Sequence, residues 1–240
     1  MIYGTRAVME AIVAGKTIER IMIQSGLNND LIKELIHTAK NHQVQINFVP
    51  AEKLKRMSAK NHQGVICLLS SVSYASLENI IDKVFSEGRE PFLLLLDRVT
   101  DVRNFGAIAR TAECAGIDAI VIAEKGNAPI SGDAMKTSAG ALNHVAVCRE
   151  KDLKKTMQLL QNSGIRVIAC TEKTEKDIYD VNLAGPIALI MGSEEDGISD
   201  DLLRSADELA KIPLKGKIGS LNVSVAAGVA MYEVARQRRA

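Results

Sequence analysis

Aromatic residues are scarce in this sequence and tryptophan is absent: Phe, Trp and Tyr together make up 3% of the 240 residues. RNA-binding modules such as the RRM and the OB-fold stack nucleobases on exposed aromatic rings. The composition therefore argues against a module of that kind. With 47% hydrophobic and 25% charged residues, the chain has the composition of a folded globular protein and not of a disordered one.

Long apolar runs are missing as well. The longest, such as residues 92–96 and 187–191, hold about five residues, whereas a membrane-spanning helix needs about 20. The first residues lack the basic and apolar regions of a secretory signal. We therefore expect no transmembrane helix and a cytoplasmic protein.

Metal-binding patterns are absent too. The four cysteines match no zinc motif, so we expect them to be reduced core residues; they are Cys67, Cys114, Cys148 and Cys170. Glu34 and His37 have the E-x-x-H spacing of a di-metal bundle, but such a site needs a second copy of the motif, which the sequence lacks. We expect no bound metal.

The common nucleotide-binding and hydrolase fingerprints are missing. No G-x-G-x-x-G occurs, and the glycine pair Gly192 and Gly197 is not followed by the lysine of a P-loop. The G-x-S-x-G nucleophile motif is also absent. These absences argue against a Rossmann dehydrogenase, a P-loop NTPase and an α/β-hydrolase.

The net charge of +1 conceals an asymmetry between the two ends of the chain. Residues 1–72 contain nine Lys or Arg against five Asp or Glu, and the remaining residues contain 21 against 24. The first part is therefore basic and the second slightly acidic. A basic front part is compatible with an RNA partner bound through its phosphates.

The first 72 residues alternate between helical and strand periods. Apolar spacing predicts helices over residues 6–14 and 31–39, and Pro50 is suited to open a short helix after it. Residues 20–25, 44–49 and 65–69 read as strands. We expect a small α/β domain over residues 1–72.

A serine-rich stretch, Ser70 to Ser76, follows this domain and predicts a flexible linker. An amphipathic helix from Leu77 to Phe85 comes next and ends before Gly88. We assign residues 73–90 to a linker and connecting helix, which the sequence does not attach to one domain in particular.

Residues 91–240 hold a second and longer alternating series. Continuous apolar strands separated by helices indicate a parallel sheet covered on both faces. We expect its strands at residues 92–97, 119–123, 145–148, 166–170, 187–191 and 209–214. In such sheets ligands bind at the carboxyl ends of the strands, so the loops there are the candidate site.

The first polar loop leads into a helix with an apolar stripe. We place Asn104 at the cap of that helix, and Arg110 points away from the stripe. A capping Asn and a solvated Arg are one explanation. The alternative is a polar pair in which Arg110 binds a phosphate through its forked guanidinium group.

Two further polar loops follow later strands. Gly192 and Glu194 come directly after residues 187–191, and Ser220 and Asn222 lead into the last helix, where either can act as a cap. The acidic run at residues 194–196 also suggests Mg²⁺, but such a site usually draws carboxylates from more than one element. The three loops together are more specific than any one alone.

Three segments resemble the motifs of the SpoU family of the SPOUT superfamily, RNA ribose 2′-O-methyltransferases that use S-adenosylmethionine. They are NFGAIAR (104–110), ALIMGSEEDGIS (188–199) and IPLKGKIGSLNVSVAAGVAMYEVARQR (212–238). YGTRAVMEAI (3–12) and NHQGV (61–65) are similar to the substrate-binding domain of that family. The resemblance covers nearly the whole chain and is nearest to the subgroup that methylates a guanosine of 23S ribosomal RNA. Val102 departs from the proline of many members.

The resemblance implies a small α/β substrate-binding domain followed by a parallel-sheet α/β methyltransferase domain with a carboxy-terminal trefoil knot, and a homodimer formed through the knot region. It implies S-adenosylmethionine as the methyl donor. Its contacts, carried over by motif, are Thr171, Gly192, Ile212, Leu214 and Leu221.

The resemblance also implies a set of candidate catalytic residues: Asn104, Arg110, Glu194, Ser220 and Asn222. Arg110 is the family's candidate catalyst. Because a guanidinium group rarely loses its proton, we favour a phosphate-clamping Arg110 over a general base.

Much of the positive charge of the front domain precedes NHQGV. We expect RNA contacts from Lys53, Lys55, Arg56 and Lys60. Two alternatives to a ribosomal RNA methyltransferase stay open, namely methylation of tRNA ribose and a non-catalytic RNA-binding or ribosome-assembly protein that keeps the fold.

Overall fold

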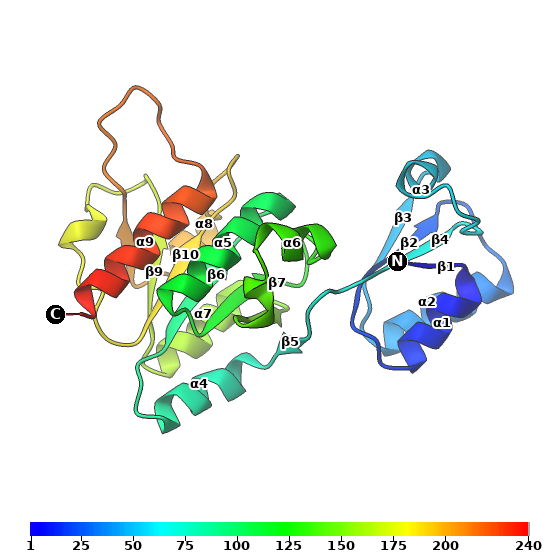
Figure 1. Ribbon diagram of the computed structural model, residues 1–240, viewed down its shortest axis with the longest axis horizontal. Helices are drawn as coiled ribbons and strands as arrows, with labels where there is room; N and C mark the ends of the chain where they lie inside the picture. The colour runs from blue at the N-terminus through cyan, green and yellow to red at the C-terminus, as the bar shows by residue number, and fades with distance from the viewer. Residues whose placement is uncertain (240) are drawn as a thin grey trace. The chain divides into compact units, whose positions relative to one another are not determined.

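The computed structural model describes residues 1–239 and divides into two compact units (Figure 1). The first contains Met1–Ser73, with Pro129–Ser131 grouped to it, and the second contains the rest of the chain from Tyr74 onward. No helix within residues 1–239 is long and apolar enough to cross a membrane.

The first unit is a four-stranded mixed sheet with helices on both faces. The strand order is β1 (Ile2–Tyr3), β4 (Val65–Leu69), β2 (Ile18–Gln24), β3 (Ile46–Val49). Strand β4 runs antiparallel to β1 and β2, whereas β2 and β3 are parallel. The helices are α1 (Thr5–Val13), α2 (Asp30–Asn41) and α3 (Ala51–Met57).

Two apolar clusters hold this unit together. Helices α1 and α2 pack on one face of the sheet through Val8 of α1 and Ile32 and Leu35 of α2. Leu54 of α3 packs on the other face, next to Ile66. Helix α3 therefore buries one apolar side chain and leaves its charged residues facing solvent.

The second unit is a seven-stranded sheet in which every pairing is parallel. Its order is β11 (Glu208–Ala210), β9 (Arg166–Cys170), β10 (Ile187–Met191), β6 (Phe92–Leu96), β7 (Ala119–Ala123), β8 (Ala146–Glu150), β5 (Tyr74–Ala75). Its helices are α4 (Leu77–Ser86), α5 (Val102–Ala115), α6 (Gly132–Thr137), α7 (Leu153–Asn162), α8 (Asp200–Leu203) and α9 (Val223–Gln237), with short 3-10 turns at Ala141–Asn143 and Ile178–Asp180.

Both faces of this sheet are covered, as the continuous apolar strands predict. Leu93 and Leu95 of β6 belong to a core cluster shared with α4, α7 and α8. Alternate side chains of a strand point to opposite faces, so Leu94 lies on the other face, where α5 and α9 run side by side (Figure 1). The predicted parallel-sheet α/β fold is confirmed.

Two local predictions are wrong. The last strand ends at Ala210 and not at Leu214, because Pro213 has no N–H to donate and the Lys211 N–H bonds to the Lys176 carbonyl (2.9 Å). Asn104 does not cap its helix, because α5 begins earlier and Asp101 is the cap.

The segment predicted as a linker and connecting helix contains β5 and α4. Strand β5 pairs with β8 at the edge of the larger sheet, and Leu77 and Ile81 of α4 belong to the core of the second unit. The helix thus joins the second unit. The carboxy-terminal trefoil knot stays a prediction.

Candidate functional site

Three side chains from the three polar loops form one hydrogen-bonded cluster at the carboxyl ends of the central strands. The Asn104 Nδ2 amide donates to Glu194 Oε1 (2.6 Å), and Asn222 Nδ2 donates to the same oxygen (2.8 Å). Asn222 Nδ2 also donates to Asn104 Oδ1 (3.1 Å). We call Asn104, Glu194 and Asn222 the polar cluster. The structure thus brings together three of the five candidate catalytic residues.

Asp101 frees Asn104 for this role. Its Oδ1 accepts from the backbone N–H groups of Arg103 (2.7 Å) and Asn104 (3.1 Å), which a helix start otherwise leaves unpaired. These bonds lower the pKa of Asp101, with the bond from Asn104 the largest cause. Because Asp101 satisfies the cap, the Asn104 side chain is available to bind Glu194.

Asn222 has two roles at once. Its Oδ1 accepts from the Ser224 N–H (3.0 Å) and so caps α9, while its Nδ2 binds the polar cluster. The amide is suited to both because it carries an acceptor and a donor on one side chain. Ionised Asp has no donor, and Ser has a single O–H where Asn222 Nδ2 makes two donor bonds.

A cavity of about 380 Å³ lies beside the polar cluster. Glu194 and Ser220 line it together with all five residues predicted to contact the methyl donor, which are Thr171, Gly192, Ile212, Leu214 and Leu221. Its walls come from the loops after β9, β10 and β11. The predicted cofactor residues, far apart in the sequence, therefore converge on one site.

The lining of this cavity suits a cationic ligand with a flat apolar part. Apolar walls are provided by Met191, Ile212, Leu214, Leu221, Val223 and Ala226, and carboxylates by Glu172, Glu194, Glu195 and Asp196. The one lysine on the wall, Lys211, is paired with Glu175 (2.8 Å) and contributes little positive charge. S-adenosylmethionine has an apolar adenine face and a sulfonium charge, so the residues fit it.

The residues around the cavity do not indicate a cysteine nucleophile or a metal centre. Burial raises the pKa of the Cys170 thiol to about 12, so it is protonated and a poor nucleophile at neutral pH. Among residues 1–239, no group of three or more His, Cys, Asp or Glu is placed to hold a metal ion.

A second cavity of about 270 Å³ adjoins the first. The loop from Ser193 to Asp196 and Val223 line both cavities, while Thr100 and Asn104 line only the second. Glu194 of the polar cluster therefore lies where the two cavities meet. A ligand in the first cavity and a second ligand in the second cavity would therefore both contact Glu194.

Arg110 and Ser220 are not part of the polar cluster. Arg110 follows Asn104 by six residues on α5, which is about 9 Å along the axis and about 120° around it. It is exposed and makes no hydrogen bond or ion pair within the described chain. Ser220 is also exposed and lines the first cavity.

The four predicted RNA-binding residues lie in the first unit. Lys53, Lys55 and Arg56 are exposed on α3, and Lys60 follows it with its ammonium 5.5 Å from the centre of the Tyr3 ring. None of the four forms an ion pair with a carboxylate within residues 1–239. We call Lys53, Lys55, Arg56 and Lys60 the basic patch; its charge is free to meet a phosphate.

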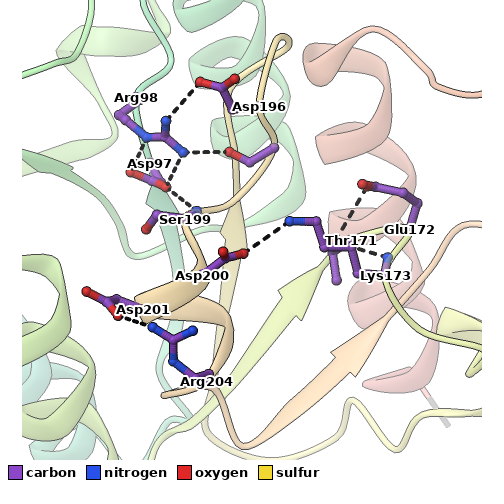
Figure 2. A network of polar contacts seen from close by, with 11 residues as sticks. Asp97, Arg98, Thr171, Glu172, Lys173, Asp196, Ser199, Asp200, Asp201 and Arg204 are labelled. Carbon is purple, nitrogen blue, oxygen red and sulfur yellow. Dashed lines mark hydrogen bonds and ion pairs between the residues drawn. The ribbon is translucent and has the colours of Figure 1, made fainter.

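Asp97 and Arg98 were not predicted. Figure 2 shows them at the start of the loop after β6, bonded to the segment that carries Glu194 and Ser199. The Asp97 carboxylate accepts from the Ser199 N–H (2.8 Å), and Arg98 donates to Asp196 Oδ2 (3.1 Å) and the Gly197 carbonyl (3.0 Å). Asp97 is identifiable as the polar residue that ends the predicted strand at residues 92–97, whereas nothing in the sequence singles out Arg98.

A second set of contacts in Figure 2 anchors the loop after β9. Thr171 accepts from the Lys173 N–H (3.3 Å), and the Lys173 ammonium binds Asp200 at the start of α8 (3.2 Å). Thr171 is buried, and its N–H donates to the Ala210 carbonyl (2.9 Å). These bonds fix the wall of the first cavity opposite the Glu194 loop.

Solved structures of methyltransferases share this two-unit fold. The SpoU methyltransferase AviRb from Streptomyces viridochromogenes gives a TM-score of 0.63 at 23% identity and covers 99% of this chain and 89% of its own. An AdoMet-bound rRNA methyltransferase from Sinorhizobium meliloti gives 0.61 at 23% identity, over 95% and 84%. This chain therefore shares its fold with these methyltransferases.

The chain belongs to the SpoU rRNA Methylase family, whose model matches residues 91–232. Residues 1–75 match the model for RNA 2′-O ribose methyltransferase substrate binding. A Staphylococcus epidermidis protein named as a TrmH family tRNA/rRNA methyltransferase is 34% identical over 238 residues, which are 99% of this chain and 96% of that relative. The membership predicted from the three motifs is confirmed, and the protein is an RNA methyltransferase.

Proposed function

We propose that this protein transfers a methyl group from S-adenosylmethionine to a ribose 2′-hydroxyl of RNA, with a guanosine of 23S ribosomal RNA as the target. The observation that carries the proposal is the convergence of the three polar loops. They place the polar cluster on the rim of a cavity whose apolar and acidic walls suit the methyl donor.

The methyl donor, when bound, supplies an activated methyl group. The protein's own task is then to hold the ribose hydroxyl in line with that methyl and to help remove its proton. Glu194 Oε1 is already saturated by two amide donors, so the polar cluster is a fixed hydrogen-bonding surface. We assign to it the orientation of the hydroxyl, together with Ser220, which lines the same cavity as Glu194.

Arg110 serves in this proposal as a clamp for the phosphate next to the target ribose. Its fork matches two phosphate oxygens, and the clamped phosphate or a water accepts the proton. Since Arg110 lies away from the polar cluster of its own chain, we propose that the clamp forms in a homodimer.

An exposed apolar stripe supports that dimer. Val225 is 52% exposed and Tyr232 51% exposed on α9, and their spacing of seven residues places them on one helix face. Helix α5, which carries Arg110, runs beside α9. A second copy covering this stripe would bring Arg110 near the interface; replacing Tyr232 by Glu should then shift the protein from dimer to monomer in sedimentation velocity.

The choice of ribosomal RNA over tRNA rests on the first unit. A separate RNA-binding unit with a basic patch suits a large folded target, whose phosphates it can contact at a distance from the modified ribose. The relatives' names include both tRNA and rRNA, so methylation of tRNA ribose is the second candidate.

Labelled S-adenosylmethionine tests the proposal directly. The protein is incubated separately with ribosomal RNA and with tRNA from cells lacking it, and the modified nucleotide is mapped by primer extension at low dNTP. Label on a 23S guanosine is the expected result. Label on tRNA alone would transfer the proposal to the second candidate, and RNA binding without any label would favour a non-catalytic RNA-binding protein.

A further inference from the structure

The loop that carries Glu194 is closed on itself. The Ser193 and Gly197 backbones exchange two hydrogen bonds of 3.1 Å each, and the Asp196 N–H donates to Ser193 Oγ (3.0 Å). A Cβ on Gly192 would lie 2.1 Å from the Gly197 carbonyl carbon, so only glycine fits where the backbone of residue 192 passes that of residue 197. The loop therefore behaves as one body, and whatever holds its base also orients Glu194.

Arg98 attaches this loop to the end of the central strand β6. Its guanidinium group donates to Asp97 (3.2 and 3.3 Å) on its own side, and to Asp196 (3.1 Å) and the Gly197 carbonyl (3.0 Å) on the loop (Figure 2). The hydrogen bonding of Arg98 to the Asp97 carboxylate is the largest cause that raises the pKa of Arg98. The planar guanidinium group thus makes four hydrogen bonds to two segments, whereas an ammonium group has only three N–H donors.

The backbone at Arg98 is strained. Its φ of 56° lies in the left-handed region, which costs free energy for a residue with a side chain. Gly or Asn would adopt this conformation more readily. Strain of this kind persists where the surrounding contacts impose it, and here those contacts are the bonds to the Glu194 loop.

We propose that Arg98 is a positioning residue for the methyl-donor cavity: it holds the Gly192–Gly197 loop in the shape that binds the donor and aims Glu194 at Asn104 and Asn222. This inference rests on the proposed function, because the donor is S-adenosylmethionine. It assigns a role to a residue outside the three family motifs. Loss of the fork should weaken donor binding even where the protein stays folded.

Arg98→Gly and Arg98→Ala separate this role from a contribution to stability. Both remove the fork, but Gly relieves the strained φ and Ala does not, so the Gly variant should have the higher Tm. The affinity for S-adenosylmethionine should be reduced equally in the two variants, although their Tm values differ. We expect the Kd for S-adenosylmethionine, measured by isothermal titration calorimetry, to rise about tenfold in both variants, as expected for loss of one charged hydrogen bond.

Two further variants serve as controls. Arg98→Lys keeps the charge without the fork and should recover only part of the affinity. Arg103→Ala removes a nearby exposed arginine whose one ion pair within residues 1–239 is with Asp101, and its Kd should equal that of the wild type.

The outcomes are distinct. A Kd for Arg98→Gly within twofold of the wild type, or a Kd that recovers together with Tm, would overturn the positioning role. If the wild type binds S-adenosylmethionine but methylates no RNA, the proposed reaction fails, while the Arg98 comparison still decides the positioning role. If the wild type binds no S-adenosylmethionine, both fail.

Discussion

Substitution of Asn222 separates the two functions of that side chain, which are capping of α9 and bonding to the polar cluster. Asn222→Ser keeps an oxygen that can cap the helix but removes the Nδ2 donor to Glu194 and Asn104. Asn222→Ala removes both. Asn222→Asp keeps the cap and places a second carboxylate against Glu194.

The expected magnitudes follow from these contacts. Loss of the cap costs about 1 kcal/mol, so Asn222→Ala should lower Tm by roughly 2–4 °C, while Asn222→Ser stays close to the wild type. The donor bond to Glu194 is 2.8 Å long and charge-assisted, but the cluster is exposed, so we take the low end of about 1.5 kcal/mol. Methyl transfer by Asn222→Ser should therefore fall about tenfold.

Asn222→Asp should add a pH dependence. Two facing carboxylates raise the pKa of one of them, so lowering the pH adds a proton that restores a hydrogen bond between residue 222 and Glu194. The rate of Asn222→Asp relative to Asn222→Ser should thus increase from pH 8 to pH 6. Taking the ratio of the two variants cancels effects of pH on the rest of the reaction.

The assay is methyl transfer to RNA at saturating S-adenosylmethionine, with Tm measured on the same samples. Full activity of Asn222→Ser combined with impaired Asn222→Ala would show that Asn222 is a helix cap and nothing more. A flat ratio between the Asp and Ser variants would contradict the contact with Glu194.

Other parts of the molecule give further predictions. Arg110→Lys keeps the charge but loses the fork, so methyl transfer should drop at least tenfold with Tm unchanged; a rate near the wild type would exclude the bidentate clamp. Neutralising the first three cations of the basic patch should weaken RNA binding and flatten its dependence on salt, and an unchanged slope would place the RNA elsewhere. Arg238→Ala removes donors to three backbone carbonyls and should cost about 2 kcal/mol, seen as a fall in Tm of roughly 4–8 °C by calorimetry. Burial raises the pKa of Glu150, so its charged form destabilises the fold above the ordinary carboxyl range; Glu150→Gln should raise Tm at pH 8 and lose that advantage near pH 4.

The sheet of the second unit was predictable because its strands are continuous apolar runs. The prediction failed at residues 211–214, where the apolar run continues past the sheet edge. There the pairing of Lys211 with the loop at residues 176–178 ends the strand, and local pattern contains no sign of such a distant partner. Tyr74 and Ala75 were missed for the related reason that a two-residue edge strand has no period to detect.

The candidate site was predictable at the residues that belong to the family motifs and not at the residues outside them. Motif residues gave the polar cluster and the donor cavity, yet the sequence placed Asn104 at a helix cap, because Asn is a good cap and Asp101 lies only three residues earlier. The role of Arg98 could not be predicted from the sequence, for a physical reason. Its importance comes from a backbone conformation and from partners nearly a hundred residues away.

The most direct measurement of the central claim is the chemical position of the transferred methyl group. Ribosomal RNA from cells lacking the protein is incubated with it and isotopically labelled S-adenosylmethionine, digested to nucleosides and fragmented by mass spectrometry. The account predicts a nucleoside whose label stays with the ribose after the base is lost, and no such product from the Arg110→Lys protein above a tenth of the wild-type level. Label that leaves with the base, or no label in RNA that the protein binds, would contradict it.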